Sequence, residues 1–408
     1  MFQATFKWIK IIYKRTINSI AFVPAVIALF FLVMSFLMLE LDFSETGKHI
    51  KFRLDWLSLK DANTARSIIS SIVAGIISLT VFSFTMVMIL LNQAASQMSN
   101  RVLDQLIGNR FQQFVLGFYI GTIVYALFLL SAIRDVDSGI YVPAISTYLL
   151  IALTVTDIFI FIYFLHYITQ TIKYDTIIHR IYDDTLAVMK KECGCENEPE
   201  TTPLQKEGRL IKAFKSGIYQ GFDQEPLLAM CREEDVVIFF LFPAGTFVLK
   251  GTPLFMISSK KELSTDFENK LHSVINIHLD QEINTSYYYG FHKLMEIAIK
   301  ALSPGINDPG TAVISLRSMI DLLVYRLNAM PETNLQDEDG VVRIIKIEKD
   351  FDRMILDFVF PIWHYGKKDP LIQREMYQLL KQLKMHGEKR EINNLFISVS
   401  ATVVDLSQ

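Results

Sequence analysis

Residues 67–91 read SIISSIVAGIISLTVFSFTMVMILL and form one of four apolar runs in the first 168 residues of the chain. The other runs extend from Ile20 to Leu41, from Phe111 to Ile133 and from Val142 to Ile168. A helix needs roughly 20 apolar residues to cross the hydrocarbon core of a bilayer, and each run meets this length. The sequence therefore predicts a transmembrane domain of four helices over residues 1–168, and the lipid bilayer as a partner.

Composition and charge narrow the function classes. The chain is 51% apolar and 12% aromatic, as expected if much of it lies in lipid. Its net charge of -3 and the lack of a basic block argue against nucleic acid as a partner. Cys193, Cys195 and Cys231 are an odd number, which is not a disulfide framework. Cys193 and Cys195 have no second ligand pair, so we expect no metal site and no cofactor.

The distribution of Lys and Arg predicts the orientation. Ten basic residues flank the runs on the side of the N-terminus and six on the opposite side. The more basic side normally faces the cytoplasm. We therefore expect a multi-pass protein of the cell inner membrane with both termini in the cytoplasm. The first run is too long for a cleavable signal, so we expect it to remain as a helix.

The second apolar run differs from the others because small and hydroxylated residues recur along it. Their spacing of four, four and three places them on one helix face: Ser67, Ser71, Gly75 and Ser78. Such a face either permits close contact between helices or lines a water-filled path. The run continues into polar residues, so Gln93 and Gln97 join the candidate pore-lining residues as an inner mouth.

Asp157 is the one carboxylate well inside an apolar run. Ionisable residues at membrane depth are costly and commonly face a cavity or a partner, so Asp157 is a candidate for transport or gating. His166 is nine residues away, which places it on the opposite face of the same helix.

The remaining chain predicts a cytoplasmic α+β region. The fourth span continues as a helical stalk to Lys191, and a linker follows, so that residues 169–208 are stalk and linker. Residues 209–264 contain a series of short strand-like stretches, which predicts a small β-rich barrel or sandwich. Residues 265–408 have a helical pattern and predict a helical domain. We expect strands and helices over these ranges: Ser216 to Phe222, Val236 to Phe242, Thr246 to Ile257, Ser286 to Leu302, Thr311 to Asn328, Val341 to Tyr365 and Leu371 to His386.

Residues 301–312 read ALSPGINDPGTA and compress a helix stop, a turn and a helix start into one segment. Asp308 can cap the second helix and Pro309 suits its first position. Ser303, Asn307, Asp308 and Thr311 form either a rigid structural corner or an anion site at the helix N-terminus. The acidic cap favours the structural corner.

This segment, with VFSFTMVMILLNQAASQMSNRVL at 81–103 and FIYFLHYITQTI at 161–172, resembles a family of predicted bacterial membrane proteins of unknown function. An ALSPGINDPxTA signature characterises that family. The resemblance implies four membrane helices and a cytoplasmic domain, and no activity. It also implies a charge network near residue 286. The chain has Gln281, Ser286 and His292 at those positions, which weakens the network.

The leading functional hypothesis is an oligomeric inner-membrane channel or conductance protein for ions. The second apolar helix would line the pore, and the cytoplasmic region would form a vestibule or gate. A homo-oligomer is required because four helices enclose little volume. The alternatives are a membrane-anchored sensor or scaffold that binds a protein or small ligand, and a carrier that uses Asp157. No catalytic motif such as GxSxG or HExxH occurs, so we expect no enzyme.

Overall fold

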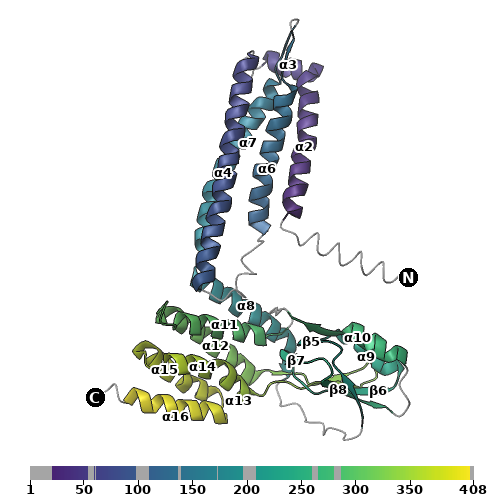
Figure 1. Ribbon diagram of the computed structural model, residues 1–408, viewed down its shortest axis with the longest axis vertical. Coiled ribbons are helices and arrows are strands. Elements are labelled where there is room, and N and C mark those ends of the chain that lie inside the picture. Colours follow the sequence, from purple (N-terminus) through teal and green to yellow (C-terminus); the bar gives the residue numbers. More distant parts are fainter. Residues whose placement is uncertain are drawn as a thin grey trace. The chain divides into compact units, whose positions relative to one another are not determined.

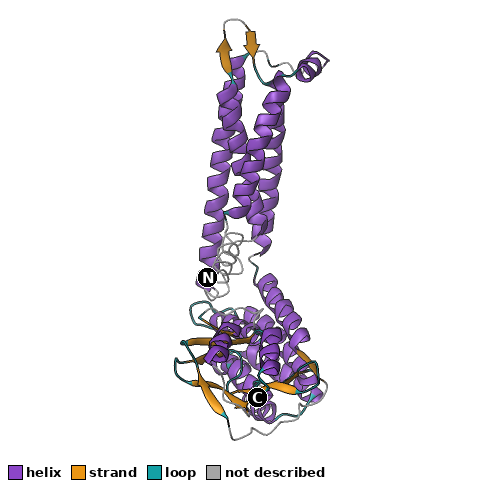
Figure 2. Ribbon diagram, turned by 90° about the vertical axis from the view of Figure 1, so that its right-hand side faces the viewer, coloured by secondary structure: helices purple, strands orange, loops and turns teal. Residues whose placement is uncertain are grey.

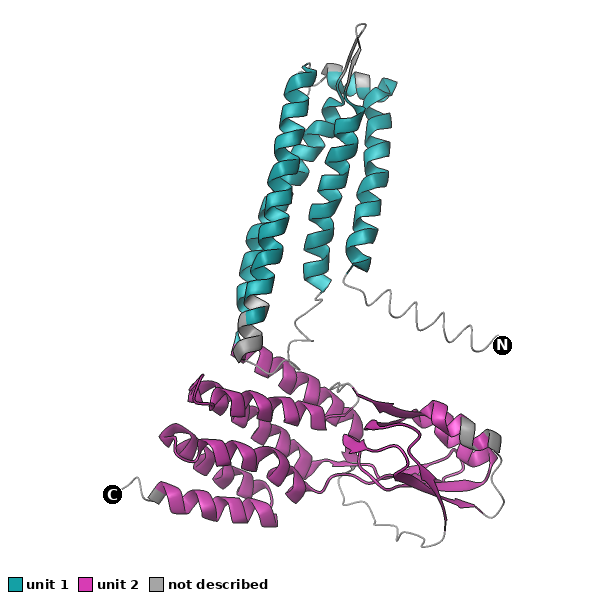
Figure 3. Cartoon of the chain, viewed as in Figure 1, with its two compact units in different colours: residues 1–96, 100–173 teal, residues 97–99, 174–408 magenta. Residues whose placement is uncertain are grey.

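The computed structural model describes residues 21–53, 59, 61–97, 110–136, 139–171, 173–195, 208–259, 265–279 and 286–404. The chain divides into two compact units (Figure 3). The first comprises residues 1–96 and 100–173 and is called the membrane unit. The second comprises residues 97–99 and 174–408 and is called unit 2. The predicted linker lies outside the described residues except for Gly208.

Four long apolar helices build the membrane unit, which confirms the predicted spans. They are α2 (Phe22–Phe43), α4 (Ala62–Gln97), α6 (Arg110–Ala132) and α7 (Ala144–Thr171). The short helix α3 (Glu45–Arg53) follows α2, and the hairpin of β1 (Arg134–Val136) and β2 (Gly139–Tyr141) joins α6 to α7 (Figure 1). The protein is therefore a membrane protein by the length and composition of these helices.

The helices of the membrane unit differ in how much of their surface the protomer covers. In the most apolar window of α6, 44% of the residues are buried, against 11% in α4. Two glycines let α2 approach α6: a Cβ at Gly117 would lie 2.7 Å from Ile27 Cδ1, and one at Gly121 would lie 2.7 Å from the Phe31 ring. Helix α6 is thus central, whereas α4, and likewise α2 and α7 with 17% of the window buried, keep most of their surface free for lipid or another chain.

A buried carboxylate joins the end of α2 to the start of α7. Asp42 accepts hydrogen bonds from the backbone N–H groups of Ser146 (2.7 Å) and Ile145 (3.2 Å), and Lys51 Nζ lies 2.6 Å from its Oδ1. The first amides of a helix have no partner within the helix and carry a partial positive charge. Asp42 therefore supplies an N-terminal cap to α7 from another helix.

The helical part of unit 2 contains eight helical segments among the described residues. They are α8 (Tyr174–Glu192), α11 (Tyr288–Ala301), α12 (Pro309–Asn328), α13 (Phe351–Met354), the π-helical Ile355–Val359, α14 (Phe360–Gly366), α15 (Pro370–His386) and α16 (Arg390–Val404). Their core includes the buried side chains of Phe291, Leu294, Leu316, Leu323 and Met376. Helices at 288–301, 309–328 and 370–386 match the predicted ones closely.

The predicted continuous stalk is wrong. Helix α7 ends at Thr171, and α8 begins as a separate helix at Tyr174. Helix α8 packs against α11, where Thr185 occupies the space above Gly290. Its buried face, with Ile177, Ile178 and Ile181, belongs to the core of unit 2. The amphipathic pattern of this segment therefore reflects burial within unit 2.

Two open sheets and two helices form the mixed part of unit 2 (Figure 2). The five-stranded sheet has the order β11-β12-β6-β8-β4 and the three-stranded sheet has the order β7-β5-β9. The strands and their helices are β4 (Arg209–Lys212), β5 (Gly217–Phe222), α9 (Gln224–Glu233), β6 (Val236–Phe240), β7 (Thr246–Val248), β8 (Pro253–Ser259), α10 (Thr265–Val274), β9 (Ile275–His278), β11 (Asn334–Gln336) and β12 (Val342–Ile345). Tyr219, Phe240 and Leu271 meet in their common core. No closed barrel occurs among the described strands, so the barrel prediction is wrong.

The predicted helix from Val341 to Tyr365 is wrong in its first third. Residues Val342–Ile345 form β12, which pairs in parallel with β6 through Ile344 and Ile238. The preceding segment holds β11 and a turn in which Asp337 Oδ2 lies 2.7 Å from Arg343 Nε. A separate two-stranded pair joins β3 (Cys193–Cys195) to β10 (Met330–Pro331).

Candidate functional site

The structure places Ser67, Ser71, Gly75 and Ser78 on the exposed face of α4. A Cβ at Gly75 would have no neighbour within 4 Å. The opposite face of α4 carries buried residues such as Ile69 and Ile76. The sequence therefore grouped these four residues correctly on one face, and that face is exposed in the protomer.

Two hydroxyls on α4 bond to their own helix. Ser78 Oγ donates to Ala74 O at 2.9 Å, and Thr85 Oγ1 donates to Val81 O at 2.8 Å. Thr85 is exposed and follows Ser78 by seven residues, so it extends the same face, which the sequence analysis missed. Such internal bonds let a hydroxyl face lipid or water at little cost. Gln93 and Gln97 lie in α4, but their side chains lie outside the described part.

Asp157 lies in the interior of the membrane unit, with an exposed fraction of 0%. Neither carboxylate oxygen accepts a hydrogen bond from a residue that the structure describes. The Thr122 side chain of α6 lies next to the Asp157 carboxylate. Tyr119 of the same helix is close enough to interact electrostatically with that carboxylate. The Tyr119 hydroxyl lies next to Ser83 of α4, and neither hydroxyl forms a hydrogen bond of good geometry there. Three helices thus direct polar groups into one buried region.

The segment from Ser303 to Thr311 brings its four predicted residues together. Asp308 caps α12, since its carboxylate accepts hydrogen bonds from the backbone N–H (3.1 Å) and Oγ1 (2.6 Å) of Thr311. Ser303 Oγ donates to Lys300 O at 2.6 Å, and Asn307 N donates to Ser303 O at 2.9 Å. Asn307 adopts φ of 50°, a conformation that Asn tolerates better than most residues. The Thr311 amide is therefore already satisfied within the segment.

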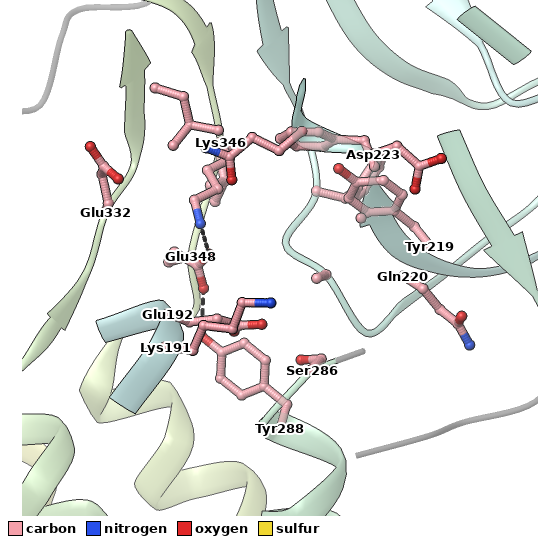
Figure 4. A pocket seen from close by; sticks show the side chains of 17 residues that line it. Lys191, Glu192, Tyr219, Gln220, Asp223, Ser286, Tyr288, Glu332, Lys346 and Glu348 are labelled. Atoms are coloured by element: carbon pink, nitrogen blue, oxygen red, sulfur yellow. Dashed lines mark hydrogen bonds and ion pairs between the residues drawn. The ribbon is translucent and has the colours of Figure 1, made fainter. Parts of the chain in front are cut away.

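A cleft of about 420 Å³ opens in unit 2 between the sheets and the helices (Figure 4). Its polar lining comes from segments far apart in sequence: Lys191, Glu192, Ser286, Tyr288, Glu332, Lys346 and Glu348. The Tyr288 hydroxyl donates to Glu348 Oε2 at 3.0 Å, and Lys346 Nζ lies 3.5 Å from Glu348 Oε1. Glu192 and Glu332 add two further carboxylates to the lining, and the cleft can therefore receive a polar or cationic small molecule.

Buried tyrosines connect this cleft to the core of unit 2. Arg326 Nε donates to the Tyr287 hydroxyl at 3.3 Å, and the Tyr287 hydroxyl donates to that of Tyr288 at 2.9 Å. The backbone N–H of Lys349 also donates to the Tyr288 hydroxyl, at 3.0 Å. Because Tyr288 in turn donates to Glu348, a continuous chain of hydrogen bonds holds that carboxylate in place.

Burial dominates the protonation of the groups around the cleft. It raises the pKa of Glu192 to about 7, with a further contribution from the negative charge of Glu348, and Lys346 and Lys191 oppose the change. Burial also raises the pKa of the Cys193 thiol to about 12. A thiol of this kind stays protonated at neutral pH and is a poor nucleophile.

Sequence reasoning missed the cleft residues. Glu348 lies in the stretch predicted as a helix from Val341 to Tyr365, and Glu192 directly follows the predicted stalk. The run of three tyrosines from Tyr287 to Tyr289 was the one local signal, because consecutive large aromatics at a helix start are costly unless they are buried. His292 Nδ1 lies 3.4 Å from Glu296 Oε1, one helical turn further along α11.

Comparisons with known proteins agree with the membrane assignment. The family model described as "Predicted membrane protein (DUF2254)" matches residues 17–382. Uncharacterized proteins of Mycobacterium bovis and Mycobacterium tuberculosis are 24% identical over 329 residues, which cover 78% of this chain. The chain spans 63% of the length of these relatives. No solved structure matches the chain significantly.

Proposed function

The chain belongs to the predicted membrane protein family DUF2254, and from this premise we propose that it is a homo-oligomeric ion channel of a bacterial inner membrane. The observation that carries the proposal is the exposed face of α4. This face combines Ser67, Ser71, Gly75 and Ser78 on the least covered of the four spans. Hydroxyls and glycine gain nothing from lipid, whereas in an assembly they line a wet path or permit close contact between copies.

Several copies are required because the interior of one membrane unit is filled by side chains such as Tyr125 and Leu129. Each copy contributes one α4 to the path, and Gln93 and Gln97 line its inner mouth. The excess of Lys and Arg on the side of the termini supports a cytoplasmic location of both ends. Unit 2 then forms a vestibule or gate.

The proposal includes no catalytic step and no cofactor. We also propose that residues 301–312 are the family signature, which an alignment of relatives over this segment tests.

Reconstitution in planar bilayers tests the channel directly. We expect ion-selective steps of current from the wild-type protein and a smaller unitary conductance from Ser71→Val, which removes a hydroxyl from the path. Ser70→Val is the matched control, since Ser70 is exposed on the neighbouring side of the helix and lies outside the stripe. A monomeric protein that passes no current under any voltage or tension contradicts the proposal.

The cleft of unit 2 favours a second function, that of a sensor for a small ligand. Two carboxylates beside an aromatic wall, Glu192 and Glu348 with Tyr219, suit an amine. A thermal-shift series with putrescine and spermidine tests this function, with Glu348→Gln expected to abolish the shift. No shift with any amine contradicts the sensor and leaves the channel proposal untouched.

A further inference from the structure

We propose that the membrane unit holds a binding site for one monovalent alkali-metal cation, with Na⁺ as the probe, between α4, α6 and α7. Its ligands are the carboxylate of Asp157, the hydroxyls of Thr122 and Tyr119, and the hydroxyl of Ser83. The site is distinct from the proposed ion path, because Ser83 lies on the buried face of α4 and the stripe lies on the exposed face.

The polar groups are buried, and all except the Thr122 hydroxyl lack a hydrogen bond of good geometry to a described residue. Asp157, Thr122 and Tyr119 have exposed fractions of 0%, and Ser83 has 6%. Both oxygens of Asp157, the Tyr119 hydroxyl and the Ser83 hydroxyl find no hydrogen bond among the described residues. Native proteins pair nearly all buried polar atoms, so several orphans in one place indicate a ligand.

Charge balance selects a cation. A carboxylate in a low-dielectric interior is very unfavourable unless a positive charge accompanies it. Asp42, in the same unit, has Lys51 at 2.6 Å, whereas no ion pair with Asp157 occurs among the described residues. A single carboxylate is neutralised by one monovalent cation, and a divalent cation would leave a net positive charge in the membrane interior.

The oxygen chemistry fits an alkali cation. Hard cations prefer oxygen ligands, and all four side chains offer oxygen. Thr122 Oγ1 already donates its proton to Phe118 O at 3.1 Å, so its lone pairs remain available to a cation. A hydroxyl of Ser or Tyr accepts a cation in the same way while it keeps its proton. The cluster therefore offers up to five side-chain oxygens from three helices.

Occupancy has a mechanical consequence. Ser83 comes from α4, the span with the least buried surface, while the other three ligands belong to α6 and α7. A bound cation therefore attaches α4 to the remainder of the membrane unit. Because the ligand binds only the folded state, the cation stabilises the protein, and the stabilisation increases with the logarithm of the cation concentration above the dissociation constant.

The test is equilibrium binding of ²²Na⁺ to the full-length protein in detergent at pH 8, with choline as the replacement cation. We expect one saturable Na⁺ per chain. Asp157→Asn abolishes this binding, and Ser83→Ala and Tyr119→Phe each weaken it about tenfold, as expected for the loss of one neutral ligand. Ser70→Ala is the matched control, since it removes the same group from an exposed position of α4 outside the stripe and leaves Na⁺ binding unchanged.

Absence of Na⁺ binding to the wild type at pH 8 overturns the proposal, because the Asp157 carboxyl is then neutralised by a proton alone. Binding by Asp157→Asn equal to that of the wild type overturns it as well. Circular dichroism and gel filtration verify the fold of each variant. If Asp157→Asn does not fold, Ser83→Ala and Tyr119→Phe test the site, and unchanged Na⁺ affinity in both contradicts it. The channel proposal fails separately, because it is tested by the current in planar bilayers, whereas the cation site is tested by Na⁺ binding in detergent.

Discussion

Asp42 and Asp157 are both buried in the membrane unit, yet their surroundings differ. Asp42 accepts two backbone N–H groups of α7 and pairs with Lys51, so its charge is fully compensated. The polar groups near Asp157 in the described part of the chain are the hydroxyls of Thr122 and Tyr119. Since a charge without a partner is not maintained at membrane depth, the first residue serves the structure and the second points to a ligand.

Asp42→Asn tests the structural role. The substitution removes the charge that faces Lys51 and one acceptor for the first turn of α7. We expect the free energy of unfolding of the membrane unit to fall by about 1–3 kcal/mol. Thermal unfolding of the purified protein in detergent measures the change. Glu40→Gln, at an exposed position of the same helix, is the control, and an equal effect of both variants contradicts the assignment.

Glu192→Gln tests the protonation of the cleft. The pKa of Glu192 is about 7 in the folded protein against an ordinary value of 4.5. Over this interval the folded protein keeps a proton that the unfolded chain loses, so the stability of unit 2 falls as the pH rises from 4.5 to 7 and is constant above. The variant lacks this slope and is more stable at pH 8 by about 1–3 kcal/mol.

Denaturation followed by Trp363 fluorescence measures this slope. Trp363 is buried in α14 of unit 2, and Trp8 and Trp56 are first replaced by Phe so that it is the sole reporter. Glu234→Gln, exposed at the end of α9, keeps the wild-type slope as a control. An unchanged slope in Glu192→Gln would falsify the proposed protonation.

At the scale of elements, α4 presents two faces with different chemistry. One face is apolar and buried through Ile69 and Ile76, and the other is exposed and lined by small residues. If copies of α4 meet, Ser71→Cys forms a disulfide-linked dimer on oxidation in membranes. Ile77→Cys, exposed on another side of the helix, does not. Non-reducing electrophoresis detects the disulfide-linked dimer in either variant. The native Cys193, Cys195 and Cys231 are first replaced by alanine.

The local patterns predicted some elements well and others wrongly. Long apolar runs revealed the four spans because a bilayer demands a length that no other element needs. Asp308 and Pro309 revealed the start of α12 because caps are local. In contrast, β12 was predicted as helix, since its apolar residues fit either period and its partner β6 lies about a hundred residues earlier in the chain.

At the scale of the whole molecule, substitutions at two glycines distinguish an effect on assembly from an effect on folding. A side chain at Gly75 meets open space in the protomer, whereas one at Gly117 meets Pro24 Cα at 2.9 Å. We expect Gly75→Leu to keep the thermal stability of the protomer and to lower the number of subunits in native mass spectrometry. Gly117→Leu destabilises the membrane unit itself. Unchanged assembly in Gly75→Leu would argue against a contact through α4.

The candidate sites likewise contain residues that the local sequence reveals and residues that only the folded structure brings together. Asp157 was recognisable in the sequence because a carboxylate in an apolar run is anomalous by itself. Its companions Ser83, Tyr119 and Thr122 were not, because ordinary hydroxyls in membrane helices become meaningful only when three helices bring them together. The cleft around Glu348 was hidden for the same reason.

The cap that Asp42 supplies to α7 has a consequence for biogenesis. Its partners Ile145 and Ser146 are synthesised more than a hundred residues after it. Lys51, by contrast, follows Asp42 by nine residues, so this counter-ion is synthesised long before the amides of α7. A chain truncated before Ala144 therefore keeps the ion pair of Asp42 with Lys51 but lacks the two backbone N–H groups that this carboxylate accepts in the full-length protein.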